Sequence, residues 1–389
     1  MNILFVLYES LACNSASHVD GLARELVAHG HDCVVALPKH LGDADRFAPL
    51  PYRIATYGQI LAAARCFADG RGPDIVHAWT PREIVRGFHD RLAAALPFRT
   101  VIHLEDNEDH IARVALGEPG YRDASANRLP FTFPQHLTSP IQAPGFFARA
   151  AGVTLLIDRL AECMPVERPH QVFWPAVERA VFHPRPRNDA LRAAHGIPPN
   201  QIVLCYHGNM HQANRAEIRS LYLAVALLNR QGFPARLVRM GTDHVAHAPE
   251  YRQWADAFTT ELGYVVDRRR LVDVLAMADV YVQPGTADAF NDFRFPSKLP
   301  EFFSLGRPVL LPKTNIGLVT RHMQDAWVLE EANGQNIAAA VKAICSDRGL
   351  WRTLAEGACA FGEEHFCWSR SAAKVAAFYE VIARDTVTA

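Results

Sequence analysis

Residues 291–317 read NDFRFPSKLPEFFSLGRPVLLPKTNIG, which contains a loop, a helix and a buried strand in succession. Ser297 is predicted as the N-cap of the helix, which places Pro300 at the third helical position, where a missing N–H costs no intrahelical bond. Gly306 ends the helix, because glycine readily adopts the positive φ that is common there. The apolar run 308–312 then predicts a short strand, so the stretch is one unit of a parallel α/β sheet.

The start of this predicted helix suits a negatively charged ligand. The amides of Lys298 and Leu299 have no partner within the helix, and a helix N-terminus carries roughly half a positive charge, to which the Lys298 ammonium adds a full one. Glu301 follows one turn later, and its carboxylate, which only accepts hydrogen bonds, suits the vicinal hydroxyls of a ribose. The alternative is an ordinary helix of a parallel sheet with good capping residues.

The segment resembles the donor site of the retaining GT-B glycosyltransferases of the family-4 type. In that family two spaced glutamates flank the donor, and the second binds the ribose; Glu301 matches the second. The position of the first falls on Phe293, so the sequence departs from the family pattern at the residue expected near the sugar. Asp292 is the nearest acidic substitute, offset by one position.

The length of 389 residues predicts two domains, because single cores stop growing beyond roughly 250 to 300 residues. The stretch 173–184 is punctuated by prolines and predicts the boundary, so we expect a first domain at residues 1–174 and a second at 175–365. The spacing of this stretch also resembles the hinge of the same family. That resemblance implies that a C-terminal helix, in residues 366–389, packs back on the first domain.

Composition and charge exclude several classes of protein. A formal net charge of −1, with 21% charged residues, argues against nucleic acid as the main partner. The eight cysteines lack C-x-x-C spacing, which indicates buried, reduced thiols of a cytoplasmic protein and neither a zinc site nor a disulfide framework. No apolar run approaches the 18 or so residues of a transmembrane helix. The Arg268-Arg269-Arg270 cluster predicts a solvated helix start, with contact at the inner membrane surface as the alternative.

The first half of the chain reads as a series of short apolar strands with a helix, residues 19–29, after the first of them. The loop 9–18 lies beyond the carboxyl end of that strand, where open α/β sheets bind ligands. In the resembling family this loop carries paired glycines near the donor phosphates or the acceptor. Here it offers Asn14, Ser15, Ser17 and His18 instead. Residues 116–142 show little periodicity and predict a long loop or lid that recognises the acceptor.

Two further predicted strands, 74–78 and 100–104, each carry a histidine near their end. A structural role is the simpler interpretation of His77. For His103 the resemblance implies a place near the transferred sugar. The polar turn that follows, Glu105-Asp106-Asn107, is predicted on the acceptor side. A metal site built from His103, Glu105 and His110 is disfavoured, because their spacing is irregular.

In the second half, a strand at 202–206 leads to a turn at Gly208 and Asn209. The family has an arginine and a lysine here that hold the donor diphosphate, and this sequence has asparagines at both positions, with Arg215 one residue further on. Residues 262–285 resemble the family segment whose backbone meets the nucleobase. The resemblance therefore places the donor at Gly208, Asn209, Arg215, Arg294, Phe295, Pro296, Ser297, Lys298 and Glu301.

We therefore predict an α/β protein of the GT-B type, with two Rossmann-like domains facing across a cleft. The second would bind a nucleotide sugar and the first a glycan, lipid-linked or small-molecule acceptor, as in polysaccharide biosynthesis. As the resemblance implies, transfer would retain the anomeric configuration without metal or other cofactor, with His103 and Asp292 near the sugar. A GT-B nucleotide-sugar epimerase and a non-catalytic binding or scaffold protein are the alternatives, and the oligomeric state is left open.

Overall fold

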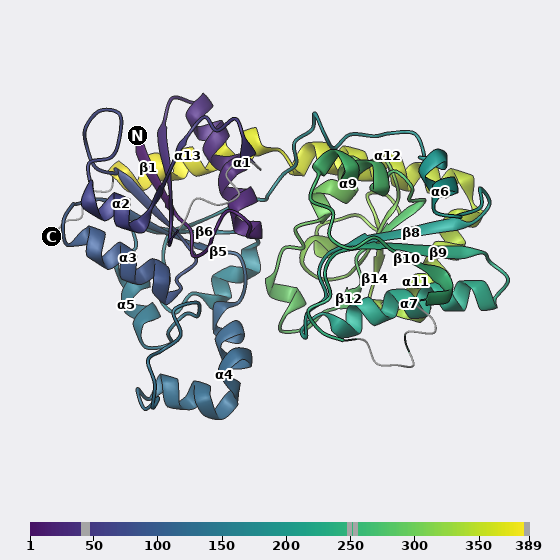
Figure 1. Ribbon diagram of the computed structural model, residues 1–389, viewed down its shortest axis with the longest axis horizontal. Helices are drawn as coiled ribbons and strands as arrows, with labels where there is room; N and C mark the ends of the chain where they lie inside the picture. The colour runs from purple at the N-terminus through teal and green to yellow at the C-terminus, as the bar shows by residue number, and fades with distance from the viewer. Residues whose placement is uncertain (40–46, 247–250, 252–255, 385–389) are drawn as a thin grey trace. The chain divides into compact units, whose positions relative to one another are not determined.

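The computed structural model describes residues 1–39, 47–246, 251 and 256–384, which form two compact units (Figure 1). Unit 1 consists of the described residues up to Pro175, together with Phe293–Phe295 and the described residues from Cys367 onward. Unit 2 consists of the described residues of Ala176–Asp292 and Pro296–Phe366.

Unit 1 contains a seven-stranded parallel sheet within the described residues. Its strands are β1 (Asn2–Val6), β2 (Asp32–Leu37), β3 (Arg53–Thr56), β4 (Ile75–Trp79), β5 (Arg99–Leu104), β6 (Gly152–Leu155) and β7 (His170–Val172), in the spatial order β3-β2-β1-β4-β5-β6-β7. Its helices are α1 (Asn14–Ala28), α2 (Tyr57–Ala62), α3 (Glu83–Ala93), α4 (Glu108–Ser125), α5 (Gln142–Arg149), the 3-10 helix η2 (Asp158–Cys163) and α13 (Trp368–Arg384). The order of strands reverses between β1 and β4, which is where doubly wound sheets bind ligands.

Unit 2 contains a six-stranded parallel sheet within the described residues and repeats the same scheme. Its strands are β8 (Ile202–His207), β9 (Ala235–Met240), β10 (Thr259–Glu261), β11 (Val280–Val282), β13 (Val309–Pro312) and β14 (Trp327–Leu329), in the order β10-β9-β8-β11-β13-β14, beside an antiparallel pair of β12 (Gly285–Thr286) and β15 (Glu331–Ala332). The helical elements that follow Pro175 in the chain, apart from α13, are α6 (Asp189–Ala194), α7 (Arg215–Arg230), α9 (Arg268–Leu275), η3 (Asn291–Phe293), α10 (Leu299–Ser304), η4 (Asn315–Leu318), α11 (Gly334–Ser346) and α12 (Arg348–His365).

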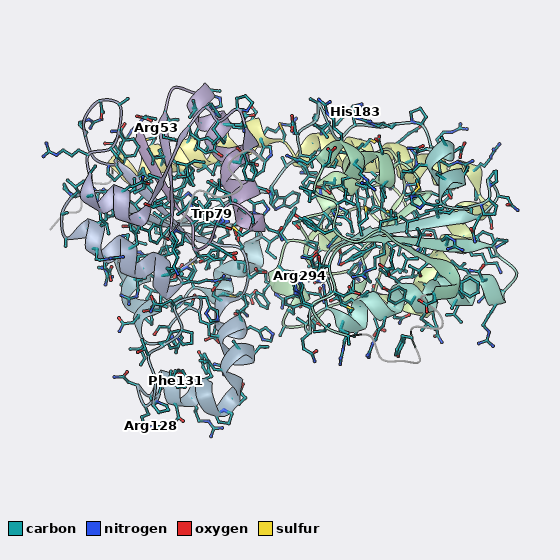
Figure 2. The ribbon with its side chains drawn as sticks, in the orientation of Figure 1. Arg53, Trp79, Arg128, Phe131, His183 and Arg294 are labelled. Atoms are coloured by element: carbon teal, nitrogen blue, oxygen red, sulfur yellow. The ribbon has the colours of Figure 1, made fainter. Side chains whose placement is uncertain are left out.

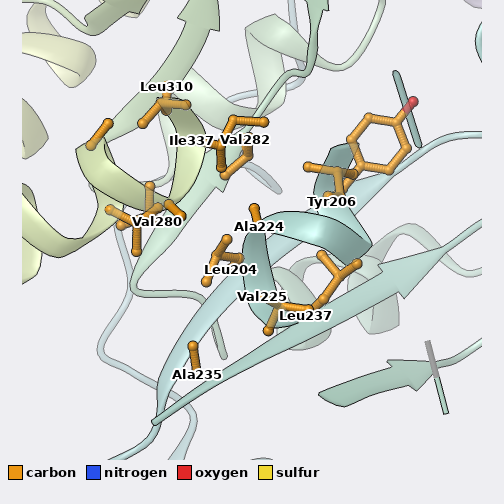
Figure 3. Packing of buried hydrophobic residues seen from close by; sticks show 14 of the residues in the cluster. Leu204, Tyr206, Ala224, Val225, Ala235, Leu237, Val280, Val282, Leu310 and Ile337 are labelled. Carbon is orange, nitrogen blue, oxygen red and sulfur yellow. The ribbon is translucent and has the colours of Figure 1, made fainter. Parts of the chain in front are cut away.

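The core of unit 2 lies between its sheet and the α7 and α11 helices, which cover one face while α9 and α12 cover the other (Figure 1). Leu204, Val282 and Leu310 of the sheet are fully buried, as are Val225 of α7 and Ile337 of α11 (Figure 3). Each such side chain contributes about 1.5 to 3 kcal/mol on leaving water. Because helices cover both faces, the strands read as continuous apolar runs and not as alternating ones.

The α13 helix belongs to unit 1 and packs beside α1 (Figure 1). A β-carbon on Gly21 of α1 would lie 2.2 Å from the Trp368 indole, and one on Gly152 of β6 would lie 2.4 Å from the Phe378 ring. The two glycines are therefore needed so that the aromatic side chains of α13 can reach the sheet and α1.

Two predicted helix boundaries were wrong. The α1 helix begins at Asn14 and not at Val19, so the four predicted ligand residues of that region lie on its first turns and not in a loop. Ser297 is not the N-cap of α10; Lys298 occupies that position without a side-chain capping bond, and Pro300 is the second helical residue. The missing N–H of Pro300 still costs no hydrogen bond at this position, because the first-turn amides have no partner within the helix.

The predicted loop at 116–142 was also wrong in its first part. The α4 helix runs through Ser125, with one non-helical residue, Gly117, at φ 68°. Pro119 follows this break in the first turn of the resumed helix, where its missing N–H is tolerated. The irregular segment is confined to residues 126–141, where Arg128 and the half-exposed Phe131 are labelled in Figure 2. No described helix is both long and apolar enough to cross a bilayer.

Candidate functional site

The polar side chains of unit 1 converge on Glu105, directly after β5. Ser15 and His18 approach it from α1: the Ser15 hydroxyl donates to one carboxylate oxygen, and Nδ1 of His18 lies 2.8 Å from the other. The indole Nε1 of Trp79, at the end of β4, donates to the same oxygen as His18 at 2.9 Å. The structure thus brings together three of the predicted acceptor-side residues, because β1, β4 and β5 end at the same edge of the sheet.

The pKa values of the two neighbouring carboxyl groups of this turn are shifted in opposite directions. Burial alone would raise the pKa of Glu105, but the hydrogen bond and charge of His18 outweigh it and hold that pKa at about 2. Burial raises the pKa of Asp106 to about 7, and the charges of Glu105 and Glu108 add to the effect. At neutral pH Glu105 is therefore ionised, whereas Asp106 is close to its midpoint and can give or take a proton.

His103 lies inside unit 1 and not on its surface. Its side chain is 0% exposed, and its ring lies 4.0 Å from the tilted Trp79 ring and stacks on Phe173, 5.2 Å away. Nδ1 lies 2.8 Å from the Thr154 hydroxyl, while Nε2 has no hydrogen-bond partner among the described residues. Burial lowers the pKa of His103 to about 3, so the imidazole is neutral.

The remaining predicted residues of unit 1 do not join this cluster. Asn14 is exposed at the start of α1, and Ser17 is half-buried on the same helix. Asn107 is the N-cap of α4, where its side chain accepts the amide of His110 at 3.0 Å. Asn107 therefore has a structural role, which accounts for an asparagine at that position.

In unit 2, Glu301 of α10 meets the carboxyl end of β8. Its Oε2 lies 2.6 Å from Nε2 of His207, although the two atoms are not aligned as a hydrogen bond, so the contact is an ion pair when the imidazole is protonated. The two side chains are 16% and 18% exposed.

Lys298 extends across the turn that follows β8. A β-carbon on Gly208 would lie 3.0 Å from Cε of Lys298, and Gly208 itself has φ 146°, which L residues rarely adopt. The ammonium donates to Oε1 of Gln283 at 3.3 Å and lies 4.9 Å from the centre of the Tyr206 ring. A glycine at position 208 therefore gives Lys298 its path to the strand ends.

The asparagines that replace the family's basic residues hold the turn itself. Asn209 accepts the amide of Thr242 at 2.8 Å, and the Asn214 side chain spans the turn from the Asn209 carbonyl, 3.0 Å, to the amide of His211, 2.7 Å. Arg215 follows as the first residue of α7 and is half-buried. Lys298 and Arg215 are thus the predicted cations that lie in unit 2.

Asp292 is anchored at the carboxyl end of β13. The Thr314 hydroxyl donates to its carboxylate, and Thr314 is itself 0% exposed. The neighbouring residue Asn291 donates to Oε1 of Glu217 at 2.7 Å and accepts at its carbonyl from Asn315 at 2.9 Å. The irregular backbone predicted around Asp292 is a 3-10 turn, η3, fixed on both sides by these bonds.

The other predicted donor residues are divided between the units. Arg294 and Phe295 belong to the short segment of unit 1, where the Phe295 ring lies 6.3 Å from Trp174. Pro296 is buried in unit 2 and Ser297 is exposed there. Arg294 and Phe295 are thus assigned to a different unit from Lys298, and their role at the donor stays a prediction.

Two residues at the edge of unit 1 were not predicted from the sequence. Trp79, labelled in Figure 2, donates a hydrogen bond to Glu105. The sequence feature that could have indicated it is its place two residues after His77, at the end of a predicted strand. Thr80 has φ 74° and is 1% exposed, with no partner for its hydroxyl among the described residues. Such a conformation costs about 1 to 3 kcal/mol and clusters at functional sites, but threonine gives no sequence signal for it.

Metal-binding groups and cavities do not add to the site. Among the described residues no cluster of three or more His, Cys, Asp or Glu side chains could hold a metal ion. The eight cysteines are free thiols, but only Cys33 and Cys205 are fully buried, so the predicted burial holds for two of them. Two surface cavities of unit 2, of about 390 and 650 Å³, are lined by none of the predicted site residues. The candidate site is therefore defined by the polar side chains at the strand ends and not by these cavities.

The second half of the chain matches a known family. Residues 201–347 match the family model described as glycosyl transferases group 1. The chain is 29% identical over 212 residues to a GDP-mannose-dependent alpha-(1-6)-phosphatidylinositol dimannoside mannosyltransferase of Mycobacterium tuberculosis. The aligned region covers 54% of this chain and 52% of the relative. This chain therefore spans about half the length of the curated relatives it matches.

Solved structures share the fold over the whole chain. Anabaena HepE, in complex with UDP and glucose, superposes with a TM-score of 0.73 at 14% identity, covering 98% of this chain and 99% of its own. Sucrose-phosphate synthase of Thermosynechococcus elongatus gives 0.69 at 14% identity, covering 99% and 100%. The predicted GT-B fold is confirmed, and the family match and the relative confirm the predicted resemblance to glycosyltransferases of the family-4 type.

Proposed function

We propose that the protein transfers a sugar from a nucleotide-sugar donor to an acceptor hydroxyl, because residues 201–347 match the family model of the group 1 glycosyltransferases and the chain has the GT-B fold. We assign donor binding to the second domain, residues 175–365, and acceptor binding to the first, residues 1–174 with the helix of residues 366–389. The described part of that helix ends at Arg384.

The convergence of Lys298 and Glu301 on the end of β8 carries the proposal. Both come from the start of α10, both reach the turn at His207 and Gly208, and all four residues lie within the matched stretch. An ammonium and a carboxylate on one helix suit the two ends of a nucleotide's polar part, the diphosphate and the ribose. Gly208 supports this assignment, because the absence of a side chain there allows Lys298 to reach the strand ends.

The proposed reaction exchanges one bond for another at the anomeric carbon. The bond from that carbon to the diphosphate oxygen breaks, the acceptor oxygen forms a new bond to the carbon, and the acceptor proton passes to the leaving diphosphate. Lys298 and Arg215 would stabilise the charge that develops on the diphosphate, so that no metal is required in this proposal. Retention of the anomeric configuration rests on the family resemblance, with Asp292 and His103 proposed near the sugar.

The acceptor proposal rests on unit 1. Glu105 and Asp106 follow β5 at the sheet edge, and carboxylates at such an edge suit the hydroxyls of a sugar. The name of the Mycobacterium tuberculosis relative describes a mannosylated phosphatidylinositol as its acceptor. We therefore propose a glycan or lipid-linked acceptor, and activity in the cytoplasm at the inner membrane surface.

A donor panel tests this function. The protein is incubated with GDP-mannose, UDP-glucose and other nucleotide sugars, with and without glycan and lipid-linked acceptors, and free nucleoside diphosphate and product anomers are measured. We expect nucleotide release that depends on acceptor, in the absence of added metal, and a product with the donor's anomeric configuration. Sugar interconversion without acceptor would indicate an epimerase, and nucleotide-sugar binding with no turnover for any pair would indicate a binding protein.

A further inference from the structure

Four polar side chains in the interior of unit 1 form a continuous chain of close contacts. The hydroxyl of Tyr379, on α13, lies 2.6 Å from Nδ1 of His77 on β4. Nε2 of His77 lies 2.7 Å from the hydroxyl of Thr154 on β6, and the same hydroxyl lies 2.8 Å from Nδ1 of His103 on β5. All four side chains are 0% exposed, so no solvent enters the chain of contacts.

Each of the four groups carries one exchangeable proton. Burial lowers the pKa of His77 well below its ordinary value and that of His103 to about 3, so both imidazoles are neutral. Burial raises the pKa of Tyr379 well above its ordinary value, so the phenol keeps its proton. A neutral imidazole donates from one nitrogen and accepts at the other, which makes the direction of each contact depend on its neighbours.

Three arrangements of the protons satisfy all three contacts. If Tyr379 donates to His77, His77 to Thr154 and Thr154 to His103, the one group left over is an N–H at Nε2 of His103. If the direction is reversed, the Tyr379 hydroxyl has no acceptor among the described residues and Nε2 of His103 has no donor.

The third arrangement has both imidazoles donating to Thr154. It leaves the Thr154 proton without a recorded acceptor among the described residues, and again leaves Nε2 of His103 bare. The first arrangement therefore leaves one polar group unpaired and each of the others leaves two. Because an unpaired buried polar group is costly, the first is favoured.

We propose that Tyr379, acting through His77 and Thr154, is a positioning residue that fixes His103 as the Nε2–H tautomer and so makes its free edge a hydrogen-bond donor. His103 lies against the Trp79 ring, whose Nε1 binds Glu105, so one aromatic side chain connects the buried imidazole to the Glu105 cluster. Only the last step rests on the proposed function: ligand binding would uncover the buried Nε2–H, which would then donate to an oxygen of the bound sugar or acceptor.

The tautomer can be read directly by NMR in the protein without any substrate. Two-bond ¹H–¹⁵N correlations of uniformly ¹⁵N-labelled protein distinguish a protonated ring nitrogen from a bare one. The signals of His103 are assigned through ring-to-backbone correlations and by their loss in His103→Gln. We expect a protonated Nε2 and a bare Nδ1; a protonated Nδ1, which would donate to the Thr154 hydroxyl or carbonyl, overturns the proposal.

Substitutions test the path from Tyr379. Tyr379→Phe removes the first donor, after which both directions leave equal numbers of groups unpaired, so the His103 signals should shift towards a mixture of tautomers. Tyr57→Phe is the matched control, because Tyr57 is a buried tyrosine of the same unit whose hydroxyl donates to the Leu7 carbonyl. His103 signals that are unchanged in Tyr379→Phe, or equally shifted in both variants, would refute the path.

Thr154 supplies a second test that holds if the tyrosine variant does not fold. Thr154→Val keeps the shape and removes the relay hydroxyl, whereas Thr154→Ser keeps that hydroxyl. We expect mixed tautomers in the valine variant and the native tautomer in the serine variant; identical behaviour of the two refutes the proposal. With an active donor and acceptor pair, Tyr379→Phe should lower kcat by about threefold or more with little change in donor KM. Failure of every pair would remove the glycosyltransferase proposal and leave the tautomer result standing.

Discussion

The two units have the same scaffold and differ in what lies at the ends of their strands. In unit 1 the strand order reverses between β1 and β4, and in unit 2 between β8 and β11. At the first edge Glu105 is already hydrogen-bonded by Ser15, His18 and Trp79. At the second, Lys298 crosses a glycine turn towards Gln283, and Glu301 holds only a poorly aligned contact with His207.

The difference shows that a doubly wound sheet defines where a ligand binds, whereas a few side chains define which ligand. The edge of unit 1 is acidic and internally bonded, which suits a neutral hydroxyl compound. The edge of unit 2 combines a cation with a backbone turn that has no side chain, which suits a diphosphate. Four substitutions test whether this contrast is real.

The largest effect is expected for Lys298→Ala in unit 2. Loss of the ammonium should weaken a nucleoside diphosphate by about 10- to 100-fold, because a hydrogen bond to a charged group contributes about 1.5 to 3 kcal/mol. The bare nucleoside should bind almost as before. Isothermal titration calorimetry compares the two ligands, with Lys313→Ala, an exposed lysine paired to Glu330, as control. Equal losses for both ligands would mean that Lys298 supports packing.

Glu301→Gln should weaken the nucleotide by about tenfold, or roughly 1.4 kcal/mol, because the amide accepts ribose hydroxyls less strongly than a carboxylate. The same acid-to-amide change in unit 1, Glu105→Gln, is the matched control and should leave nucleotide affinity unchanged. Calorimetry with one nucleoside diphosphate measures both. Equal losses of affinity in the two variants would show that nucleotide binding does not distinguish the two units.

Asp292→Asn should lower turnover by about tenfold with little change in nucleotide affinity, as for a group that acts chiefly in the transition state. The Thr314 hydroxyl can still bind the amide oxygen, so the fold around η3 is kept. Steady-state kinetics with the active donor measure the effect, and Asp273→Asn, an exposed carboxylate of the same unit, is the control. Normal turnover of the Asp292 variant would favour the non-catalytic alternative.

The fourth effect concerns stability and not affinity or turnover, and it is expected for Asp106→Asn in unit 1. The pKa of Asp106 is raised to about 7, against about 3.9 for an unfolded aspartate. Between these values the folded state holds a proton that the unfolded state has lost, so stability falls as the pH rises through this window. The variant should lack this slope and melt a few degrees higher than the parent at pH 8.

Differential scanning calorimetry between pH 4 and 8 measures this slope, with the exposed residue Asp123, changed to Asn, as control. The pKa of Glu105, held at about 2, has the opposite sign: its contribution is present above an unfolded value of about 4.3 and is lost as the pH falls towards 2. A melting temperature that rises from pH 4 to 7 only in the parent protein would contradict the assignment for Asp106.

The strands of both units could be predicted because strands buried on both faces are continuous apolar runs. Residues 3–7 and 308–312 lie within one or two positions of β1 and β13. The start of α1 could not, because Asn14, Ser15 and Ser17 are weak helix formers. The helix begins there in a tertiary context in which the Ser15 hydroxyl binds Glu105, an interaction that local propensity does not include.

The site residues also fall into those that could be predicted from the sequence and those that could not. Lys298 and Glu301 were predicted because they are close together at the start of one predicted helix, and Glu301 also matches a family pattern. The pairing of Glu105 with Trp79 and His18 was not predicted, since these residues lie 26 and 87 positions away in the sequence. The contact of Tyr379 with His77 joins residues 302 positions apart, and no spacing rule reaches that far. The interior placement of His103 likewise depends on Thr154 and Phe173, from other strands and loops.

The return of α13 to unit 1 has a consequence for biosynthesis. Unit 1 contains the first residues of the chain, yet the helix that packs Trp368 against α1 and buries Phe378 and Tyr379 is translated after the whole of unit 2. Roughly 190 residues separate Pro175 from that helix, which takes a ribosome about 10 to 40 s at 5 to 20 residues per second. During that interval unit 2 can close its core while the sheet of unit 1 still lacks one helix, so the half of the protein that is synthesised first is completed last.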